Sequence, residues 1–259
     1  MNNVKSAGRV LDLLELFAST DRALALKDVV QVLGLPKSSA FMLMGTLAAR
    51  GYLERDRRDR FRLAPAMAAG GWVGGALGQI FRAAQPWMDR LLDSLGESVV
   101  LGALTADLDV RLLSHRVSPH EIRCDEKHLL VIPGYCTAQG HAMLSRLPPD
   151  EARAYLESRD RRALTPHTLT DVEAIMERLE QDRAQGFALN VDERFEGAAG
   201  AAVPICAPDG RPLAAINMVT VTPRFRRKQA EIVAALKEAA AAIEAEVFGR
   251  PGMQEDLTA

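Results

Sequence analysis

The sequence predicts an α+β protein made of a winged helix-turn-helix at residues 1–65, a linker helix at 66–80 and a larger domain at 81–250. Three observations support this division. Residues 1–65 contain short amphipathic helices followed by two strand-like runs around an arginine-rich turn. Beyond residue 98, strand-like runs alternate with amphipathic helices, which is typical of α+β domains. A length of 259 residues suits about two domains.

The composition is that of an ordinary globular protein, with 48% hydrophobic and 25% charged residues. No stretch approaches the roughly 18 consecutive apolar residues of a membrane-spanning helix, and the N-terminus lacks the apolar core of a secretory signal. The small, odd number of cysteines argues against a disulfide framework. We therefore expect a cytoplasmic protein with no membrane partner.

Charge is distributed unevenly along the chain. Residues 1–65 contain 11 Lys and Arg against 7 Asp and Glu, a net charge of +4, whereas the remaining residues contain 21 against 27, a net charge of −6. A basic N-terminal part indicates a polyanionic partner such as DNA. Chance variation of charge along the chain explains the same numbers equally well.

A helix-turn-helix is expected within residues 26–50. Apolar residues at helical spacing predict helices at 7–19, 26–33 and 36–50, with a tight turn at 34–36 because glycine ends one helix and proline suits the start of the next. In this motif the second helix of the pair enters the major groove with its N-terminal residues leading. The expected DNA-contacting residues of this helix are Lys37, Ser38, Ser39, Phe41 and Met42.

A hairpin with an arginine-rich tip follows. Beside a recognition helix, such a hairpin is a wing whose arginines bind phosphates or enter the minor groove. The alternative is a solvated tip in which Asp56 and Asp59 offset the arginines. Together with the preceding helices, the hairpin favours binding of double-stranded operator DNA, with contacts expected from Arg55, Arg57, Arg58 and Arg60.

The remainder begins with a Gly- and Ala-rich stretch at 66–78, which lacks the spacing of phosphate-binding loops and predicts a linker or a close-packed helix.

Thr170 and Glu173 have the spacing of a capping box, and Gly186 is expected to end the helix that they begin. Strands are predicted at 99–104, 110–116, 129–132, 187–191, 199–206 and 213–221. Helices are predicted at 80–95, 150–158, 171–185 and through 232–247, and a further helix is expected to follow the loop at 134–140.

Four short motifs are distinctive. They are Gly-Leu-Pro-Lys-Ser-Ser at 34–39, Gly-Tyr-Leu-Glu-Arg at 51–55, Thr-Ala-Gln-Gly-His-Ala at 137–142 and Ala-Pro-Asp-Gly-Arg-Pro-Leu-Ala-Ala at 207–215. With them, the chain resembles the IclR family of bacterial transcription regulators over about residues 5–248. Two positions depart from that family's pattern: Met42 lies near its frequent Arg or other long polar residue, and His141 replaces its usual Lys.

The resemblance implies a GAF-like effector-binding domain with an antiparallel sheet and a pocket between the sheet and the loop at 134–142. Carried over position by position, the effector-binding residues are Ala138, Gln139, Asn190, Gly200 and Asn217. Unpaired backbone N–H groups at the helix start near 138–140 favour a carboxylate, and the amides supply polar contacts in an apolar lining. The alternative is that each amide bonds only to nearby backbone.

The resemblance further implies a repressor or activator of a nearby, frequently catabolic, operon. Its operator affinity would respond to a small organic metabolite such as a carboxylic or aromatic acid, and it would act as a homodimer or homotetramer. We expect no cofactor and no enzymatic activity.

The main alternative is an enzyme with an appended winged-helix module. Cys136 and His141 are close in sequence, as a thiol-dependent hydrolase would require, although spatial adjacency is also needed. A methyltransferase would need a glycine-rich loop after a strand, which the sequence lacks. One cluster of possible metal ligands has spacings unlike the usual zinc patterns, so no metal is expected at His115, His120, Cys124 and His128.

Overall fold

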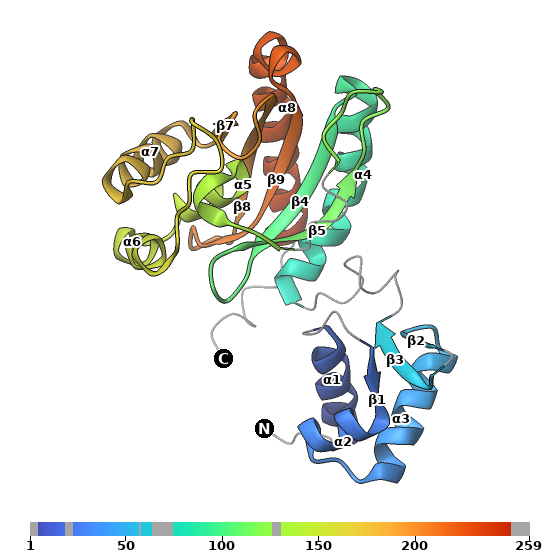
Figure 1. The fold of residues 1–259 in the computed structure, drawn as a ribbon. Coiled ribbons are helices and arrows are strands. Elements are labelled where there is room, and N and C mark those ends of the chain that lie inside the picture. The colour runs from blue at the N-terminus through green and yellow to red at the C-terminus, as the bar shows by residue number, and fades with distance from the viewer. Residues whose placement is uncertain (1–4, 19–22, 57, 64–74, 126–130, 250–259) are drawn as a thin grey trace. The chain divides into compact units, whose positions relative to one another are not determined.

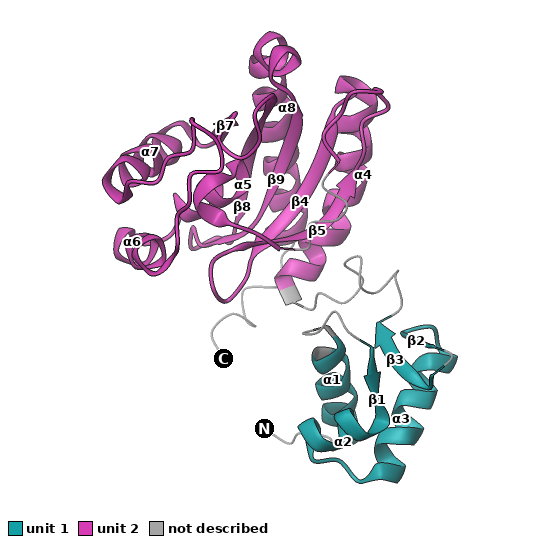
Figure 2. Ribbon diagram, in the orientation of Figure 1, with its two compact units in different colours: residues 1–73 teal, residues 74–259 magenta. Residues whose placement is uncertain are grey.

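The computed structural model describes residues 5–18, 23–56, 58–63, 75–125 and 131–249. The chain divides into two compact units, residues 1–73 and 74–259 (Figure 2). Most of the linker helix expected at 66–80 lies outside the described residues. Its last residues belong to a helix that runs without interruption from Gly75 to Leu95.

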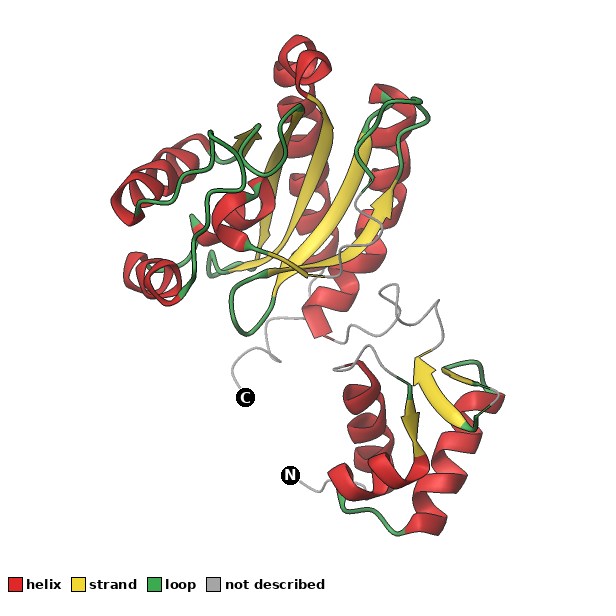
Figure 3. Cartoon of the chain, viewed as in Figure 1, coloured by secondary structure: helices red, strands yellow, loops and turns green. Residues whose placement is uncertain are grey.

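The smaller unit combines three described helices with a short antiparallel sheet of order β1-β3-β2 (Figures 1 and 3). Its elements are α1 Lys5–Ala18, β1 Leu24–Ala25, α2 Leu26–Leu33, α3 Lys37–Ala49, β2 Leu53–Arg55 and β3 Arg60–Leu63. The helix-turn-helix and the hairpin expected from the sequence are therefore confirmed. The two-residue strand β1 was not expected, because so short a strand has no detectable periodicity.

One apolar core holds this unit together. Buried side chains from every element meet in it, among them Phe17, Val29, Met44, Leu53 and Phe61. The predicted turn between α2 and α3 is present: Gly34 has φ of 62°, and its N–H donates to the Val30 carbonyl at 3.0 Å. Glycine adopts this left-handed conformation without the steric cost that a side chain would add.

The larger unit is a six-stranded sheet of order β6-β5-β4-β9-β8-β7, in which every described pairing is antiparallel. The expectation of an antiparallel sheet domain is confirmed. The strands are β4 Ser98–Leu104, β5 Val110–Arg116, β6 Val131–Ile132, β7 Ala188–Val191, β8 Ala198–Cys206 and β9 Pro212–Val221, and the helices are α4 Gly75–Leu95, the 3₁₀ helix η2 Gly134–Cys136, α5 Ala138–Leu144, α6 Pro149–Ser158, α7 Val172–Gln185 and α8 Thr222–Phe248.

The two faces of this sheet are covered differently. The long helix α8 packs on β8 and β9 and is joined by α4, whereas the short helix α5 covers the same strands from the other side (Figure 1). The register pairs Gly102 with Ala215 and Gly200 with Val219, and Ala202 with Asn217. Because side chains alternate between faces along a strand, these residues share one face. A Cβ on Gly102 would meet Gln139 Nε2 of α5 at 2.8 Å, so small residues let α5 lie close to the sheet.

Two details differ from the sequence-based expectation. The N-cap of α7 is Asp171, whose carboxylate accepts from Ala174 N at 2.9 Å, so the capping box expected at Thr170 is wrong by one residue. A carboxylate is as good an N-cap acceptor as a hydroxyl, and spacing alone did not distinguish the two. The predicted stop at Gly186 is confirmed by its φ of 79°. Residues 129 and 130, the first half of the strand expected at 129–132, lie outside the described residues, and the second half is β6.

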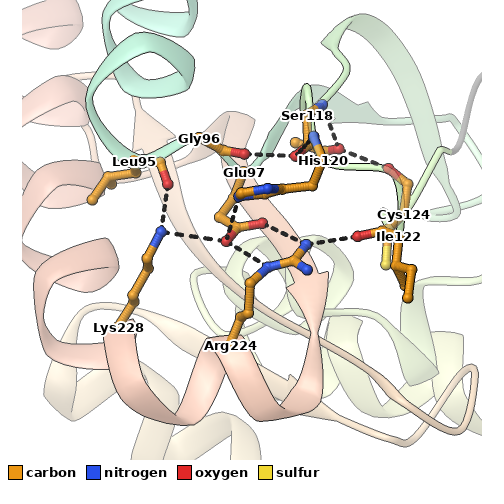
Figure 4. A network of polar contacts seen from close by, with 10 residues as sticks. Leu95, Gly96, Glu97, Ser118, His120, Ile122, Cys124, Arg224 and Lys228 are labelled. Atoms are coloured by element: carbon orange, nitrogen blue, oxygen red, sulfur yellow. Dashed lines mark hydrogen bonds and ion pairs between the residues drawn. The ribbon is translucent and has the colours of Figure 1, made fainter.

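A buried carboxylate joins α8 to the start of β4 (Figure 4). Glu97 accepts hydrogen bonds from Arg224 Nε at 2.9 Å and Nη2 at 3.1 Å, and from Lys228 Nζ at 3.4 Å. The same cations donate to the carbonyls of Ile122 and Leu95. Burial acts to raise the pKa of Glu97, but the hydrogen bonds from Arg224 and the nearby positive charges outweigh it and hold that pKa below its ordinary value.

Among the described helices, none is long and apolar enough by itself to cross a bilayer. The pair α2 and α3, bent by 118°, reaches that length and composition only when the two helices are taken together.

Candidate functional site

The exposed face of α3 presents an apolar and hydroxyl surface. Its outward residues fall at i, i+3, i+4 and i+7: Ser38, Phe41, Met42 and Gly45. Phe41 is 56% exposed and Met42 is 71% exposed, which are high values for large apolar side chains. Lys37 is also exposed at the start of the helix, and Ser39 is half-buried.

A surface groove brings the start of α3 together with the hairpin tip. Lys37 and Arg58 both line it, and so do Lys27 and Gln31 of α2. Three cations around one groove suit phosphate oxygens. The sequence-based interpretation missed Lys27 and Gln31 because it treated α2 only as a support for the next helix. Their signal was present, since both lie on the polar side of an amphipathic helix.

The hairpin tip agrees in part with each of the two expectations, a DNA-binding wing and a solvated tip whose arginines are neutralised by aspartates. Arg55 pairs with Asp59 at 3.0 Å, and Arg60 pairs with Asp56 at 2.9 Å. Arg58 forms no ion pair with a carboxylate of the described residues, and Arg57 lies outside them. Exposed ion pairs contribute at most about 1 kcal/mol, so a phosphate can replace a carboxylate at these guanidinium groups.

In the larger unit, the five residues expected to bind an effector all line one cavity of about 40 Å³ beside α5 and strands β7 to β9. They are Ala138, Gln139, Asn190, Gly200 and Asn217. The rest of the wall is formed by Ile132, Thr137, Arg194, Phe195, Ala198, Ala199 and Val219. Most of these side chains are apolar, with a few polar groups among them, as is usual for small-molecule sites.

Two of the amide nitrogens in this wall, those of Gln139 and Asn190, bond to backbone that is distant in sequence. Gln139 Nε2 donates to the carbonyls of Val100 at 3.4 Å and Ala215 at 3.1 Å. Asn190 Nδ2 donates to the Cys136 carbonyl at 2.8 Å. These bonds fix the amides without using every oxygen: Gln139 Oε1 and Asn217 Oδ1 are buried with no hydrogen-bond partner among the described residues.

The start of α5 differs from what was expected of it. Thr137 Oγ1 accepts from Gly140 N at 3.2 Å and donates to the Pro133 carbonyl at 3.0 Å. The Gly140 N–H is therefore capped within the chain and is not available to a ligand, because an N-cap hydroxyl takes it. Gly140 itself is needed for close packing, since a Cβ there would lie 2.0 Å from the Gly134 carbonyl oxygen.

Arg194 and Phe195 are wall residues that sequence reasoning missed. They lie in the loop between β7 and β8, and the Arg194 guanidinium lies 5.1 Å from the centre of the Phe195 ring. Residues were carried over by motif, and this loop belongs to none of the four motifs. The available signal was an arginine beside an aromatic residue shortly after the strand that carries Asn190.

The thiol and imidazole considered for catalysis do not form a nucleophilic pair. Burial raises the pKa of the Cys136 thiol to about 11, so it stays protonated near neutral pH. Burial lowers the pKa of His141 to about 4, and its Nε2 lies 2.6 Å from the Tyr135 carbonyl oxygen. The alternative of a Rossmann-type methyltransferase also finds no support in the described strands, whose pairing is antiparallel.

Helix α7 places a charged group beside two buried carboxyls. Arg178 Nε lies 3.5 Å from Asp182 Oδ1, and Arg178 Nη2 lies 3.9 Å from Glu193 Oε1. Asp182 Oδ2 lies 3.9 Å from His141 Nδ1. Burial, only partly offset by Arg178, raises the pKa of Asp182 to about 6 and that of Glu193 to about 7.

Comparison with known proteins gives consistent results for both units. Residues 77–245 match the family described as bacterial transcriptional regulator IclR C-terminal, and residues 6–57 match the IclR helix-turn-helix domain. The chain is 31% identical over 245 residues to a glycerol operon regulatory protein of Streptomyces coelicolor, covering 93% of this chain and 95% of that protein. It is 28% identical over 226 residues to a Pca regulon regulatory protein of Pseudomonas putida, covering 87% and 77% respectively.

A solved structure of similar fold is that of an IclR homolog from Microbacterium hydrocarbonoxydans complexed with 4-hydroxybenzoate. The two share 26% sequence identity with a TM-score of 0.64, and the alignment covers 95% of this chain and all of that one.

Proposed function

The chain belongs to the IclR family of bacterial transcriptional regulators, and we propose that it binds operator DNA through α3 and the hairpin at 53–63 while an acid bound in the cavity beside α5 sets its affinity for that DNA. We propose further that the acid is a small carboxylic or aromatic acid and that the regulated genes form a catabolic operon. The relative named as a regulator of a glycerol operon supports a catabolic operon, and the homolog solved with 4-hydroxybenzoate supports an aromatic acid as the ligand.

The observation that carries the effector proposal is the convergence of Gln139, Asn190 and Asn217 on one apolar-walled cavity. These residues come from a helix and two strands that are separated by many residues in sequence. Their oxygens and the neighbouring apolar wall offer orientation and burial to one small ligand. A ligand changes DNA affinity only if it binds one conformation of the protein better than the other.

On the DNA side, the proposed contacts divide by chemistry. Lys37 and Arg58 neutralise phosphates, together with Lys27 in the same groove. Phe41 and Met42 meet base edges through apolar contact, for which a thymine methyl is the best partner. The hydroxyls of Ser38 and Ser39 and the arginines Arg55, Arg57 and Arg60 complete the proposed surface.

A homodimer or homotetramer is part of the same proposal, because a helix-turn-helix protein usually reads two half-sites with two copies of its recognition helix. The protein would act in the cytoplasm, where the chromosome is. We propose no catalytic role, and the protonated, buried thiol of Cys136 supports that view.

The test is a binding titration of the full chain on fluorescent duplexes that tile the regions flanking its gene, at low ionic strength. At least one duplex is expected to bind specifically, and a small acid is expected to change that affinity and to raise the melting temperature by mass action. Asn217→Leu should keep DNA binding and lose the response to the acid. If the chain binds none of the duplexes, either with or without acids, the proposal is refuted.

A further inference from the structure

The end of the sheet at which β8 turns into β9 contains a groove of about 490 Å³. Three arginines from three separate segments line it: Arg146 after α5, Arg183 of α7 and Arg211 of the turn between the two strands. A second groove of about 330 Å³ shares Arg146 and Gly210 with the first and adds Lys237 of α8. Four cations therefore line two adjoining grooves at this end of the larger unit.

These grooves are separate from the cavity beside α5. No described residue lines both that cavity and either groove. Along β8 the cavity ends at Gly200, whereas the second groove begins at Val203 and reaches Cys206. The strand runs roughly 20 Å from Gly200 to Cys206 at its usual rise per residue. A ligand in the grooves therefore occupies a different site from that of the proposed effector.

Two of the four cations are held in place by neutral partners. Arg183 Nε donates to the Ser145 carbonyl at 2.6 Å, and Arg183 Nη2 donates to the Leu147 carbonyl. Lys237 Nζ donates to the Gln185 carbonyl at 2.8 Å. Carbonyl oxygens fix these side chains without neutralising their charge, so both are preorganised for an anion.

Arg146 and Lys237 both lie beside Gly186, the residue that ends α7. A Cβ at Gly186 would stand 3.7 Å from Arg146 Nη2 and 4.0 Å from Lys237 Nζ, so both nitrogens lie near one point. The two positive charges repel each other, and neither forms an ion pair with a carboxylate of the described residues. Arg146 Nε is also buried without a hydrogen-bond partner among those residues, which costs free energy. An anion that binds the Nε and Nη2 edge of Arg146 removes both penalties.

The carboxylates in the walls are occupied elsewhere, and none of them pairs with these cations within the described part of the chain. Asp209 Oδ1 accepts from the backbone N–H of Arg211 at 2.9 Å, and Glu244 Oε1 accepts from that of Cys206 at 2.6 Å. Glu151 lies in the first turn of α6, where the helix dipole stabilises a negative charge. The cations therefore remain available to a ligand.

The arrangement of the cations favours a phosphate group over a carboxylate. A phosphate monoester has a charge of about −1.5 to −2 near pH 7 and three acceptor oxygens that point in different directions, whereas a carboxylate has one charge and two oxygens in a plane. Guanidinium groups bind phosphate in a bidentate manner. A groove of about 490 Å³ also has room for more than the phosphate, and most of its wall is charged, which suits a polar body on the ligand.

We propose that this groove binds the phosphate group of a small phosphorylated metabolite through Arg146, Arg183 and Arg211, with Lys237 of the adjoining groove as a fourth cation. The site is a second ligand site of the larger unit, and it does not depend on which effector occupies the cavity beside α5.

The experiment is calorimetry on the full chain with four probes: inorganic phosphate, ribose 5-phosphate, ribose and succinate. Inorganic phosphate tests the anion site alone, ribose 5-phosphate adds a polar body, ribose lacks the phosphate, and succinate replaces it with carboxylates. Both phosphates should bind with a dissociation constant below about 1 mM, and ribose and succinate should bind at least about 10-fold more weakly.

Arg146→Met should weaken the binding of both phosphates by about 10- to 100-fold. Arg211→Met should weaken it by a smaller factor, and because Arg211 lies on an exposed turn, this variant tests the groove even if Arg146→Met fails to fold. The controls are Arg226→Met, an exposed arginine outside both grooves, and Asn217→Leu in the cavity beside α5. Both should bind the phosphates as the unaltered chain does.

The proposal is wrong if neither phosphate binds the unaltered chain, or if Arg146→Met and Arg211→Met bind phosphate normally. It is also wrong if Asn217→Leu alone loses phosphate binding, since the phosphate then occupies the effector cavity. Succinate that binds as tightly as the phosphates would show a site for carboxylates. If the two groove variants weaken DNA binding and leave phosphate binding unchanged, the groove contacts DNA. Operator binding by α3 and the response to an acid are measured separately, so the proposed function stands or falls on its own test.

Discussion

Arg224 donates hydrogen bonds to both oxygens of the Glu97 carboxylate, at 2.9 and 3.1 Å, across 127 residues of sequence (Figure 4). The glutamate side chain is fully buried and the arginine side chain is 18% exposed. The pair joins the first turn of α8 to the residue before β4, on the opposite side of the sheet from the cavity. It therefore belongs to the framework that holds the sheet, and its loss should affect folding before it affects ligand binding.

We expect Arg224→Met to destabilise the larger unit by about 3 kcal/mol, since removing one member of a buried pair leaves the other charge uncompensated. Lys228 stays within 3.4 Å of the carboxylate and limits the loss. Urea denaturation at pH 7 measures the effect. Arg226→Met, an exposed neighbour on the same helix, is the control and should change stability by less than about 0.5 kcal/mol. If the two variants are equally stable, the pair contributes little to the fold.

The same pair predicts an acid limit to stability. The pKa of Glu97 is lowered in the folded chain, so the contribution of Glu97 to stability is present above the ordinary pKa and is lost as pH falls through the lower, folded value.

Replacing both members of the pair, as Glu97→Gln with Arg224→Met, removes the uncompensated charge. The double variant should be more stable than Arg224→Met alone, whereas additive losses would contradict the pairing.

The groove between α2, α3 and the hairpin predicts a salt dependence of DNA binding. Removing one cation that binds a phosphate should reduce the slope of log affinity against log salt by about 0.9. We expect Lys37→Ala, Arg58→Ala and Lys27→Ala each to weaken binding to specific and unspecific duplexes alike, and to flatten that slope. Fluorescence anisotropy between roughly 50 and 200 mM salt, the range in which affinity for DNA falls steeply, checks this. Arg226→Ala, an exposed arginine in the other unit, should leave the slope unchanged.

The exposed apolar residues of α3 predict a different phenotype. Met42→Ala and Phe41→Ala remove no charge, so the salt slope should stay the same while discrimination between operator and mismatched sequence falls by about 1–3 kcal/mol at the contacted base pair. Because both side chains are more than half exposed, stability should barely change. Competition titrations with single-base variants of the operator measure the discrimination. A uniform loss on all duplexes would show that these residues do not read bases.

The smaller unit was largely predictable from the sequence, because its signals are local. The stop at Gly34, the stripe of Ala40, Met44 and Leu47, and the hairpin around 56–59 each follow from turn chemistry or periodicity within a few residues. What local pattern did not predict is which arginines are already paired. The Arg60–Asp56 and Arg55–Asp59 contacts depend on how the tip turns, and Asp59 adopts a φ of 57° there.

The residues that line the cavity could be predicted from the sequence only where the family resemblance covers them. Position-by-position transfer identified Gln139, Asn190 and Asn217, which line one wall in the structure. It could not identify Arg194, a half-buried wall residue whose Nη1 is buried without a hydrogen-bond partner among the described residues. Nor could it predict that Thr137 occupies the Gly140 N–H, since the choice between cap and ligand is decided by side-chain rotamer.

The buried carboxyl of Glu193, next in sequence to Arg194, predicts an unusual pH dependence. Its pKa is raised to about 7 by burial in the folded chain, from an ordinary value near 4.5. Between these values the folded chain holds a proton that the unfolded chain has lost. The resulting stabilisation is complete below the ordinary pKa and disappears as pH rises through about 7. Asp182, with a pKa of about 6, acts in the same direction at lower pH.

His141 faces the same cluster and acts in the opposite direction. Its pKa is lowered to about 4, so stability is lost as pH falls from about 6.5 toward that value. At pH 6.5 the imidazole is neutral in the folded chain, but about half of it is still protonated in the unfolded chain, whose pKa has the ordinary value. The effect of Glu193 is therefore isolated by comparing the unaltered chain with a variant that lacks this carboxyl and keeps His141 and Asp182.

Relative to Glu193→Gln, we expect the free energy of unfolding of the unaltered chain to fall between roughly pH 5 and 8, with a slope of up to about 1.4 kcal/mol per pH unit, the value for one proton, below the folded pKa of about 7. Glu193→Gln, which keeps the shape and carries no titratable proton, should flatten this slope and make the chain more stable than the unaltered one at pH 8. Glu196→Gln, an exposed change in the same loop, is the matched control and should follow the unaltered chain. Melting curves at half-unit steps of pH measure all three, and parallel curves for Glu193→Gln and the unaltered chain would show that Glu193 is already ionised in the folded protein.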